Sequence, residues 1–511
     1  MSDDRNLAKQ AGHLEVGARL KEQPAPELVN TAFAHEVSDG EILYRGMSLA
    51  DLAYCISLSE SGLIPQAAQG PLLRGLLELH AIAPETFTFD PIYGDVYTNR
   101  EQALRKITPP EANADGWLRT GRARRESSTV GYLLTVRRRL LNVAEAIADL
   151  IQVLLKVCNA HRATLMPDYT YLQKAHPTSL AHYLLTFAMP MLRDLDRLQA
   201  LYTRVNRSPS GGGSVNGARL PIDRERIAAL LGFDGVASHT RDAMWQADVA
   251  IEAASCVVMH LTTLDRLAED LYIFATEEFG YLTLSDAHSR TSVIMPQKKN
   301  PYSLAWVRGA ARQATGLLQT VIATNLTPSG QPDNRIFAYG DVPRLLDLGE
   351  RAARLMQSVL DRAEWHTDLM ARRAGEGFSG ATDLGDYLSE AVGLDPRTAH
   401  RLIGWAVREA QNAGIPSSQP ITAAALDRAS QAILRRPMML DDAQVSAAQD
   451  PARIVESRRG LGGASSDSVA EMVQSAQEAL QEARYWLDSA ATRIDAAESA
   501  VVALAERMAK Q

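Results

Sequence analysis

The sequence predicts an all-α protein built around a central bundle of long helices. Long segments in the middle of the chain carry apolar residues at helical spacing with few Pro or Gly, and strand-like alternation is scarce. The flanking parts show mostly short helical patterns separated by Pro- and Gly-containing loops. We therefore expect three domains in the 511 residues, with bounds 1–127, 128–366 and 367–511.

The amino-terminal domain shows two clear short helical patterns, at residues 48–64 and 69–82. A loop rich in Pro, Asn, Asp and Gly follows at 107–117. The first ten residues are polar and lack the apolar stretch of a signal peptide, and no uncharged apolar run is long enough to span a bilayer. The expected location is the cytoplasm, with no membrane contact.

The central domain begins with a broad apolar stripe that no Pro or Gly interrupts between Tyr132 and Arg162. This pattern predicts a helix from about Ser128 to Arg162, roughly 50 Å long. Similar patterns cover 179–205, 242–279 and 303–326. Pro190 is expected to kink or break the helix at 179–205.

Between these long patterns, Asp223 is a predicted start for a short helix at 224–231, which Gly232 would end. The stripes of the long helices look too wide for one partner each, so helices of several subunits are expected to form a shared multi-helix core. In the carboxy-terminal domain, 381–394 and 397–414 are predicted helices, and the Ala- and Glu-rich end at 469–511 is one long terminal helix.

Charge and composition exclude several functional classes. The formal net charge is −8, which argues against a nucleic-acid partner. Cys55, Cys158 and Cys256 lack metal-ligand spacing, so we expect buried thiols in a reducing compartment. No Gly-rich phosphate loop follows a strand, and no His, Asp and Glu cluster has metal spacing. The sequence therefore implies neither a cofactor nor a metal.

One polar segment, residues 289–301, lies between two predicted long helices. It contains two Pro residues, so it cannot be helical throughout, and it gathers hydroxyls, two Lys and one Asn. Loops held by a rigid scaffold often carry catalytic groups. The alternative is a solvated connection between helices, and composition alone does not separate the two.

The stretch MPQKKNP at 295–301 resembles the signature loop of the fumarase/aspartase superfamily, G-S-S-x-M-P-x-K-x-N, in its argininosuccinate lyase form. The resemblance extends over most of the chain and ends at about Ser468, before the terminal helix. The other similar stretches occur in the order of that family: 120–126, 169–185, 220–236, 267–287, 380–388 and 450–463.

This resemblance implies a lyase that breaks a C–N or C–O bond after removing a proton from the carbon next to a carboxylate. Such chemistry needs a positioned base and stabilisation of the extra negative charge. By resemblance, Ser292 is the base, Lys298 supplies positive charge, and Asn300 donates a hydrogen bond to the substrate or the loop. The partner is a small anionic molecule.

The second similar stretch supplies further candidates. Thr170 resembles the substrate-binding Thr of the family, with a helix cap as the alternative. Gln173 is a candidate for substrate binding or for a structural hydrogen bond. His176 is a candidate by its segment, although a lone His is more often structural.

Departures from the family pattern coincide with positions that bind its substrate. Tyr171 stands where the family has an acid–base His, and Ala123-Arg124-Arg125 where it has Ser-Arg-Asn. Tyr171 is thus a catalytic candidate or a packing residue. Arg124 and Arg125 suit binding of a planar carboxylate, because a guanidinium binds one bidentately. The alternative is that they form a solvated basic start of a helix. The stretch after the signature helix, 333–340, aligns only loosely.

Together these features predict a β-eliminating lyase that cleaves an N-substituted aspartate or similar amino dicarboxylate and releases fumarate. The alternatives are a non-catalytic relative, as in lens crystallins, and a divergent true argininosuccinate lyase. The family further implies a homotetramer in which segments of three subunits build each active site.

Overall fold

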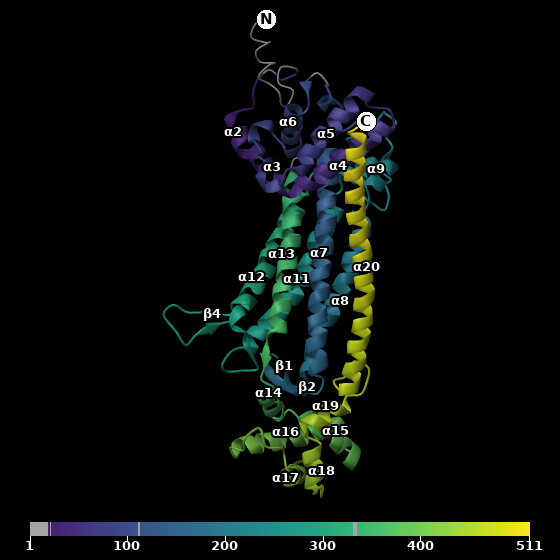
Figure 1. The fold of residues 1–511 in the computed structure, drawn as a ribbon. Helices are drawn as coiled ribbons and strands as arrows, with labels where there is room; N and C mark the ends of the chain where they lie inside the picture. The colour runs from purple at the N-terminus through teal and green to yellow at the C-terminus, as the bar shows by residue number, and fades with distance from the viewer. Residues whose placement is uncertain (1–18, 21, 111–112, 331–334) are drawn as a thin grey trace.

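The computed structural model describes residues 19–20, 22–110, 113–330 and 335–511, and it is an elongated all-α molecule (Figure 1). Six long helices form its middle: α7 (Arg124–Ala160), α8 (Leu180–Val205), α11 (Asp248–Phe274), α12 (Tyr302–Thr324), α13 (Arg335–Asp361) and α20 (Ser466–Met508). α7 is central and packs against α4, α8, α13 and α20. Its 37 residues span about 55 Å. The predicted fold class is confirmed.

The helices of the amino-terminal part gather at one end of the bundle. They are α2 (Pro26–Leu28), the π-helix η1 (Val29–Phe33), α3 (Ala34–Ser38), α4 (Gly40–Glu60), α5 (Gln66–Ala81) and α6 (Val96–Ile107), with 3₁₀ turns η2 (Pro84–Thr86), η3 (Pro91–Tyr93) and η5 (Asp115–Arg119). α9 (Arg224–Leu230) joins this end and packs on α4. As predicted, Asp223 caps it by accepting from the Arg226 N–H at 2.8 Å.

The opposite end consists of short helices: α14 (Thr367–Ala374), α15 (Ala381–Val392), α16 (Pro396–Asn412), α17 (Ala423–Leu434), α18 (Asp442–Ala447) and α19 (Pro451–Ser457). The helices α15 to α18 enclose a small core of their own around Leu384, Leu402 and Leu426, separate from the core of the bundle. Two hydrophobic clusters therefore stabilise the described chain.

α20 does not lie with the short helices that precede it. It runs back along α7 and α8 to the amino-terminal end and buries Leu480 and Ile494 on the way (Figure 1). The Arg74 guanidinium of α5 donates to the carbonyl of Ala509 at 2.6 Å. The predicted domain 367–511 is thus divided between the short helices at one end and α20 along the bundle, because the apolar stripe of α20 is buried there. The three-domain division stays a prediction.

The observed helices differ from the expected ones in three respects. α8 has no break at Pro190, which lies inside the helix, and α8 packs against α7 and α11. The pattern at 242–279 is two helices, α10 (Thr240–Trp245) and α11, because the chain leaves the helical conformation at Gln246. α13 was not foreseen as a long helix because it contains Gly340 and Pro343.

The described strands form three antiparallel pairs: β1 (Leu165–Thr170) with β2 (Gln173–Ser179), β3 (Leu282–Thr283) with β6 (Glu364–Trp365), and β4 (Arg290–Thr291) with β5 (Lys299–Asn300). The first pair connects α7 to α8, and the third carries the signature loop. Cys55, Cys158 and Cys256 are buried free thiols, as expected. In the part of the chain that the structure describes, every helix is too short or too polar to cross a membrane.

Candidate active site

The signature loop, residues 290–300, is a hairpin that projects sideways from the bundle (Figure 1). Arg290 pairs with Asn300 across its base, and the Asn300 side-chain amide donates to the Arg290 carbonyl oxygen at 2.8 Å. His288 precedes the hairpin in η6 (Asp286–His288), and its ring nitrogens lie 3.0 Å from the hydroxyls of Ser303 on α12 and Ser358 on α13. The root of the loop is thereby fixed to two long helices.

The predicted catalytic groups lie on this hairpin. The Ser292 hydroxyl oxygen accepts the backbone N–H of Met295 at 3.2 Å, and a donor aimed at that oxygen favours negative charge on it. Lys298 is exposed and lines a cavity of about 480 Å³ beneath the loop, together with Asn300 and Glu277. Lys299 instead pairs with Asp286 at 2.7 Å. Ser292 and Lys298 thus share one loop, with Lys298 accessible from solvent.

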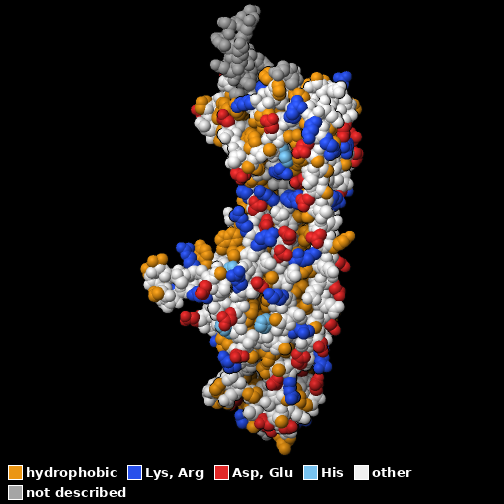
Figure 2. Space-filling model, viewed as in Figure 1, with side chains coloured by type: hydrophobic (Ala, Val, Ile, Leu, Met, Phe, Trp, Pro, Cys, Tyr) orange, Lys and Arg blue, Asp and Glu red, His pale blue; other side chains and the backbone are white. Residues whose placement is uncertain are grey.

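The tip of the hairpin is apolar and unburied. Val293 is 102% exposed and Ile294 83% exposed. Figure 2 shows hydrophobic side chains at the tip of the projection and on the bundle surface beside its base. Exposed apolar side chains gathered in one place mark interaction sites.

The second predicted segment is a β-hairpin at the other end of α7. Tyr171 and Leu172 form its two-residue turn, with φ of 53° and 57°. This left-handed conformation suits Asn and Gly, and it costs a Tyr or a Leu about 1–2 kcal/mol each. Tyr171 is 99% exposed at the tip. Backbone strain that presents an exposed phenol outward is typical of a functional position.

The other candidates of this segment flank the turn. Thr170 pairs with Gln173 across it, so Thr170 lies in a strand and does not cap a helix. Gln173 borders a cavity of about 400 Å³ between the hairpin and Arg373. The His176 ring lies 3.3 Å from the Thr382 hydroxyl of α15, which links the hairpin to the short helices.

Arg124 and Arg125 lie at the start of α7, at the opposite end of that helix from the hairpin. Arg124 donates to the Asp95 carboxylate at 2.7 Å, and Arg125 is paired with Glu36. Burial raises the pKa of Glu36, while the Arg125 charge acts in the opposite direction. Each guanidinium therefore already has a carboxylate partner, unlike the solvated helix start considered as an alternative.

Glu126 is a buried residue of this region that sequence reasoning missed. Its carboxylate accepts the backbone N–H groups of Gly211 at 2.7 Å and Gly213 at 2.8 Å, and so holds a Gly-rich loop against α7. Burial raises its pKa, although the nearby Arg122 lowers it. The run Ser210-Gly-Gly-Gly was a visible signal, because such a run exposes backbone N–H groups that an anion can accept from.

The candidate residues lie in three separate places in one chain. Arg124 begins α7, the Tyr171 hairpin follows the end of α7, and the Ser292 loop projects from the side (Figure 1). Because α7 is about 55 Å long, the first two groups cannot meet around one small molecule. Of the loosely aligned stretch 333–340, residues 333–334 lie outside the described residues.

Comparisons with known proteins agree with this fold. The family described as Lyase matches residues 22–316, and the family described as Argininosuccinate lyase C-terminal matches 378–456. The argininosuccinate lyase of Methanoculleus marisnigri is 32% identical over 469 residues, which cover 91% of this chain and 93% of that protein. That of Archaeoglobus fulgidus is 31% identical over 470 residues, covering 91% and 92%.

Among solved structures, an EDDS lyase variant with bound fumarate superimposes with a TM-score of 0.84 and 27% sequence identity. The superposition covers 96% of this chain and 97% of that one. The part of this chain that the superposition leaves out is shorter than α20, so at least part of α20 has a counterpart in the EDDS lyase variant. The expectation that the terminal helix lies outside the shared pattern therefore does not hold for this relative.

The fold and the signature loop define a lyase of the all-α, helix-bundle class. The chain belongs to the argininosuccinate lyase family within the fumarase/aspartase superfamily. It is accordingly a carbon–nitrogen lyase that acts by β-elimination.

Proposed function

We propose that this lyase cleaves an N-substituted aspartate or related amino dicarboxylate, with Ser292 as the base, and releases fumarate and an amine. The arrangement of the signature loop carries this proposal: Ser292 and Lys298 share one projecting hairpin that His288 and Asn300 hold at its root. The EDDS lyase variant with bound fumarate, similar over 96% of the chain, supports the identity of the product.

In the proposed step the Ser292 oxygen, as the alkoxide, removes a proton from the substrate CH2 carbon, which carries one carboxylate and adjoins the carbon that bears the nitrogen. The electron pair moves into the adjacent carboxylate, where the Lys298 ammonium stabilises the second charge. The pair then returns to form the C=C bond as the C–N bond breaks, and the amine leaves after it gains a proton. The phenol of Tyr171, at the position of the family's His, donates that proton.

We propose that this site forms only between subunits of a homotetramer in the cytoplasm. The length of α7 supports this, because it separates Arg124 from Tyr171 within one chain. Exposed apolar surface also supports it: Val293 and Ile294 at the loop tip, and Tyr302 and Trp306 on α12. A neighbouring subunit that covered these side chains would bring its own hairpin to the loop.

The proposed roles of the remaining candidates concern substrate binding. Thr170, Gln173 and His176 flank the hairpin turn and contact the succinyl part, and Asn300 donates to the substrate or keeps the loop closed at its root. Arg124 and Arg125 bind a substrate carboxylate in exchange for Asp95 and Glu36. Because several of these positions differ from the argininosuccinate lyase pattern, the proposed substrate carries a different amine.

The reverse reaction tests this function without knowledge of the amine. Purified protein is incubated with fumarate and a panel of primary amines and amino acids, and the loss of fumarate absorbance is followed; argininosuccinate is assayed in the forward direction. Ser292→Ala should lower the rate by roughly 10²–10⁴-fold. Ser418→Ala, the same change at an exposed serine among the short helices, is the matched control. An equal rate in Ser292→Ala and Ser418→Ala contradicts the role of Ser292.

Mixing of variants tests the shared site. Ser292→Ala and Tyr171→Ala, mixed and reassembled, should regain activity because some sites then combine an intact loop with an intact hairpin. Ser292→Ala mixed with Lys298→Ala is the control, since both changes lie on one loop and no mixed site is intact. Recovery in neither mixture places the whole site within one chain and contradicts the proposal.

A further inference from the structure

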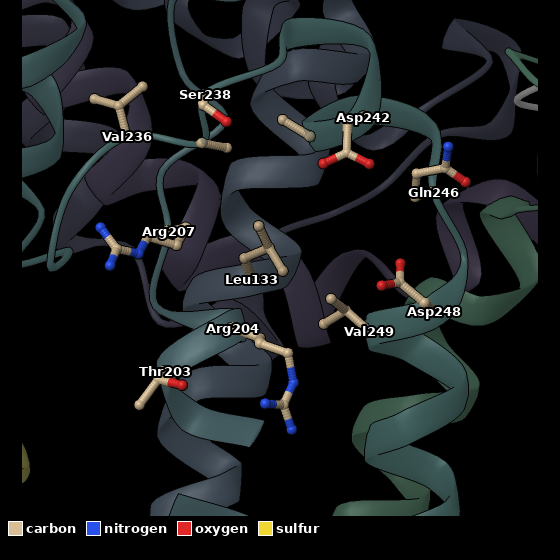
Figure 3. A pocket seen from close by; sticks show the side chains of 12 residues that line it. Leu133, Thr203, Arg204, Arg207, Val236, Ser238, Asp242, Gln246, Asp248 and Val249 are labelled. Carbon is tan, nitrogen blue, oxygen red and sulfur yellow. The ribbon is translucent and has the colours of Figure 1, made fainter. Parts of the chain in front are cut away.

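A cavity of about 510 Å³ lies where the end of α8 faces the start of α11, far along α7 from its hairpin (Figure 3). Its floor is apolar and includes Leu133 of α7 and Val249 of α11. Its size is that of small-molecule sites in proteins. The cavity contains none of the candidate residues of the lyase site.

One wall of this cavity is cationic. The Arg207 guanidinium lies over Gly235, where a Cβ atom would approach its Nη1 to 2.7 Å, and it donates to the Asp234 carbonyl at 3.3 Å. Asp234 is held in turn by Arg493 of α20 at 2.7 Å. Arg207 is thereby positioned by backbone and by α20, while its guanidinium has no carboxylate partner among the described residues. The neighbouring Arg204 is neutralised by two hydrogen bonds to Glu252.

The facing wall is anionic. Asp242 of α10 and Asp248 at the start of α11 border the cavity, and neither forms a salt bridge with a described residue. α10 is held rigidly, because the Trp245 indole donates to the Ser214 carbonyl at 2.7 Å and the Thr240 hydroxyl to the Val215 carbonyl at 3.0 Å. Asp242 and Asp248 lie opposite Arg207, with the apolar floor between them, as Figure 3 shows.

We propose that this cavity binds a bipolar small molecule, with a carboxylate at Arg207 and an ammonium or guanidinium group at Asp242 and Asp248. Among the described residues no salt bridge joins Arg207 to Asp242 or Asp248, so a ligand with both charges can contact both walls while a short aliphatic chain covers Leu133 and Val249. A ligand with one charge would make only one of these two charged contacts, whereas a bipolar ligand makes both. This site is separate from the β-elimination and does not depend on it.

Calorimetric titration with three probes of equal chain length tests the bipolar recognition. The probes are 6-aminohexanoate, hexylamine and hexanoate. We expect 6-aminohexanoate to bind about two- to fivefold more tightly than either single-charge probe, because an exposed ion pair is worth up to about 1 kcal/mol. Equal affinities for the three probes, or binding of none of them, overturn the proposal.

Variants locate the binding. Arg207→Gln and the double variant Asp242→Asn with Asp248→Asn should each weaken 6-aminohexanoate binding about two- to fivefold. Asp488→Asn, the same charge change on the exposed side of α20, is the matched control. Lys298→Ala should leave this binding unchanged. If Lys298→Ala loses the binding and the cavity variants keep it, the ligand binds at the lyase site and the proposal is overturned. Thermal unfolding checks that each variant folds. If a variant does not fold, the comparison of the three probes on the wild-type protein still tests the proposal.

Discussion

The side-chain amide of Asn300 donates a hydrogen bond of 2.8 Å to the carbonyl oxygen of Arg290 and closes the root of the signature loop. The loop between them carries Ser292 and Lys298 at positions set by this closure. In this chain Asn300 therefore orders the loop, one of the two roles that the resemblance allowed.

Replacement of Asn300 should lower activity more than stability. Asn300→Asp keeps the shape but cannot donate to the Arg290 carbonyl, so the loop root loosens. The loss of about 1 kcal/mol from one hydrogen bond predicts a fall in kcat/KM of about fivefold or more, with little change in Tm. Steady-state kinetics beside thermal unfolding measure both. Gln297→Glu, at an exposed loop position away from the root, is the control for added charge; an equal fall there assigns the effect to charge alone.

The turn at Tyr171 and Leu172 should be stabilised by glycine. Leu172 has φ of 57° and is 57% exposed, so Leu172→Gly relieves backbone strain and loses little burial. The free energy of unfolding in denaturant should rise by about 0.5–1 kcal/mol. Leu326→Gly, at an exposed leucine whose φ is negative, should give no gain. A lower stability of Leu172→Gly would mean that the leucine side chain matters more than its backbone.

His80 should make the protein sensitive to mild acid. Burial, with Arg45 and Arg100 nearby, lowers the pKa of His80 from 6.5 to about 4, and its ring lies 3.1 Å from the Ser48 hydroxyl. The unfolded chain then takes up a proton near pH 6.5 that the folded chain takes up only near pH 4. The stability that neutral His80 contributes is present above pH 6.5 and is lost as the pH falls towards 4.

Replacement of His80 should flatten this pH dependence. Between pH 6.5 and 4 the free energy of unfolding should fall by about 2 kcal/mol less in His80→Gln than in the wild type. This difference is smaller than the full pKa shift implies, because the ring is only partly buried. Denaturant titrations at several pH values measure it, and His400→Gln, at an exposed ring, is the control. Parallel pH profiles of wild type and His80→Gln would exclude this residue as the acid-sensitive group.

Two glycines with nearly the same backbone should respond differently to alanine. Gly62 has φ of 67° and open space around it, whereas Gly232 has φ of 66° and a Cβ there would lie 2.7 Å from the Ala497 Cβ of α20. Gly62→Ala should cost about 1–2 kcal/mol from backbone strain alone. Gly232→Ala should cost a further 1–3 kcal/mol or so, because α20 must shift. Equal losses in denaturant unfolding would show that α20 is not packed tightly on α9.

Much of the fold followed from local patterns in the sequence. The apolar stripe after Tyr132 indicated α7, and Asp223 marked the start of α9, because helix periodicity and capping involve residues within one or two turns. The two prolines of 289–301 likewise excluded a continuous helix there. The uninterrupted α8 around Pro190 was not predictable, because packing against α7 and α11 outweighs the cost of one proline.

The sequence by itself determined the helical class, the signature loop and the residue types that point to a lyase. The tertiary structure alone decided that Arg124 and Arg125 are paired with Asp95 and Glu36, and that the Tyr171 turn is strained and exposed. It also decided where α20 lies. The physical reason is that periodicity, capping and motifs are read from neighbours along the chain. Ion pairs, burial and the separation of the site segments depend on residues tens to hundreds of positions apart, which only the packed molecule brings together.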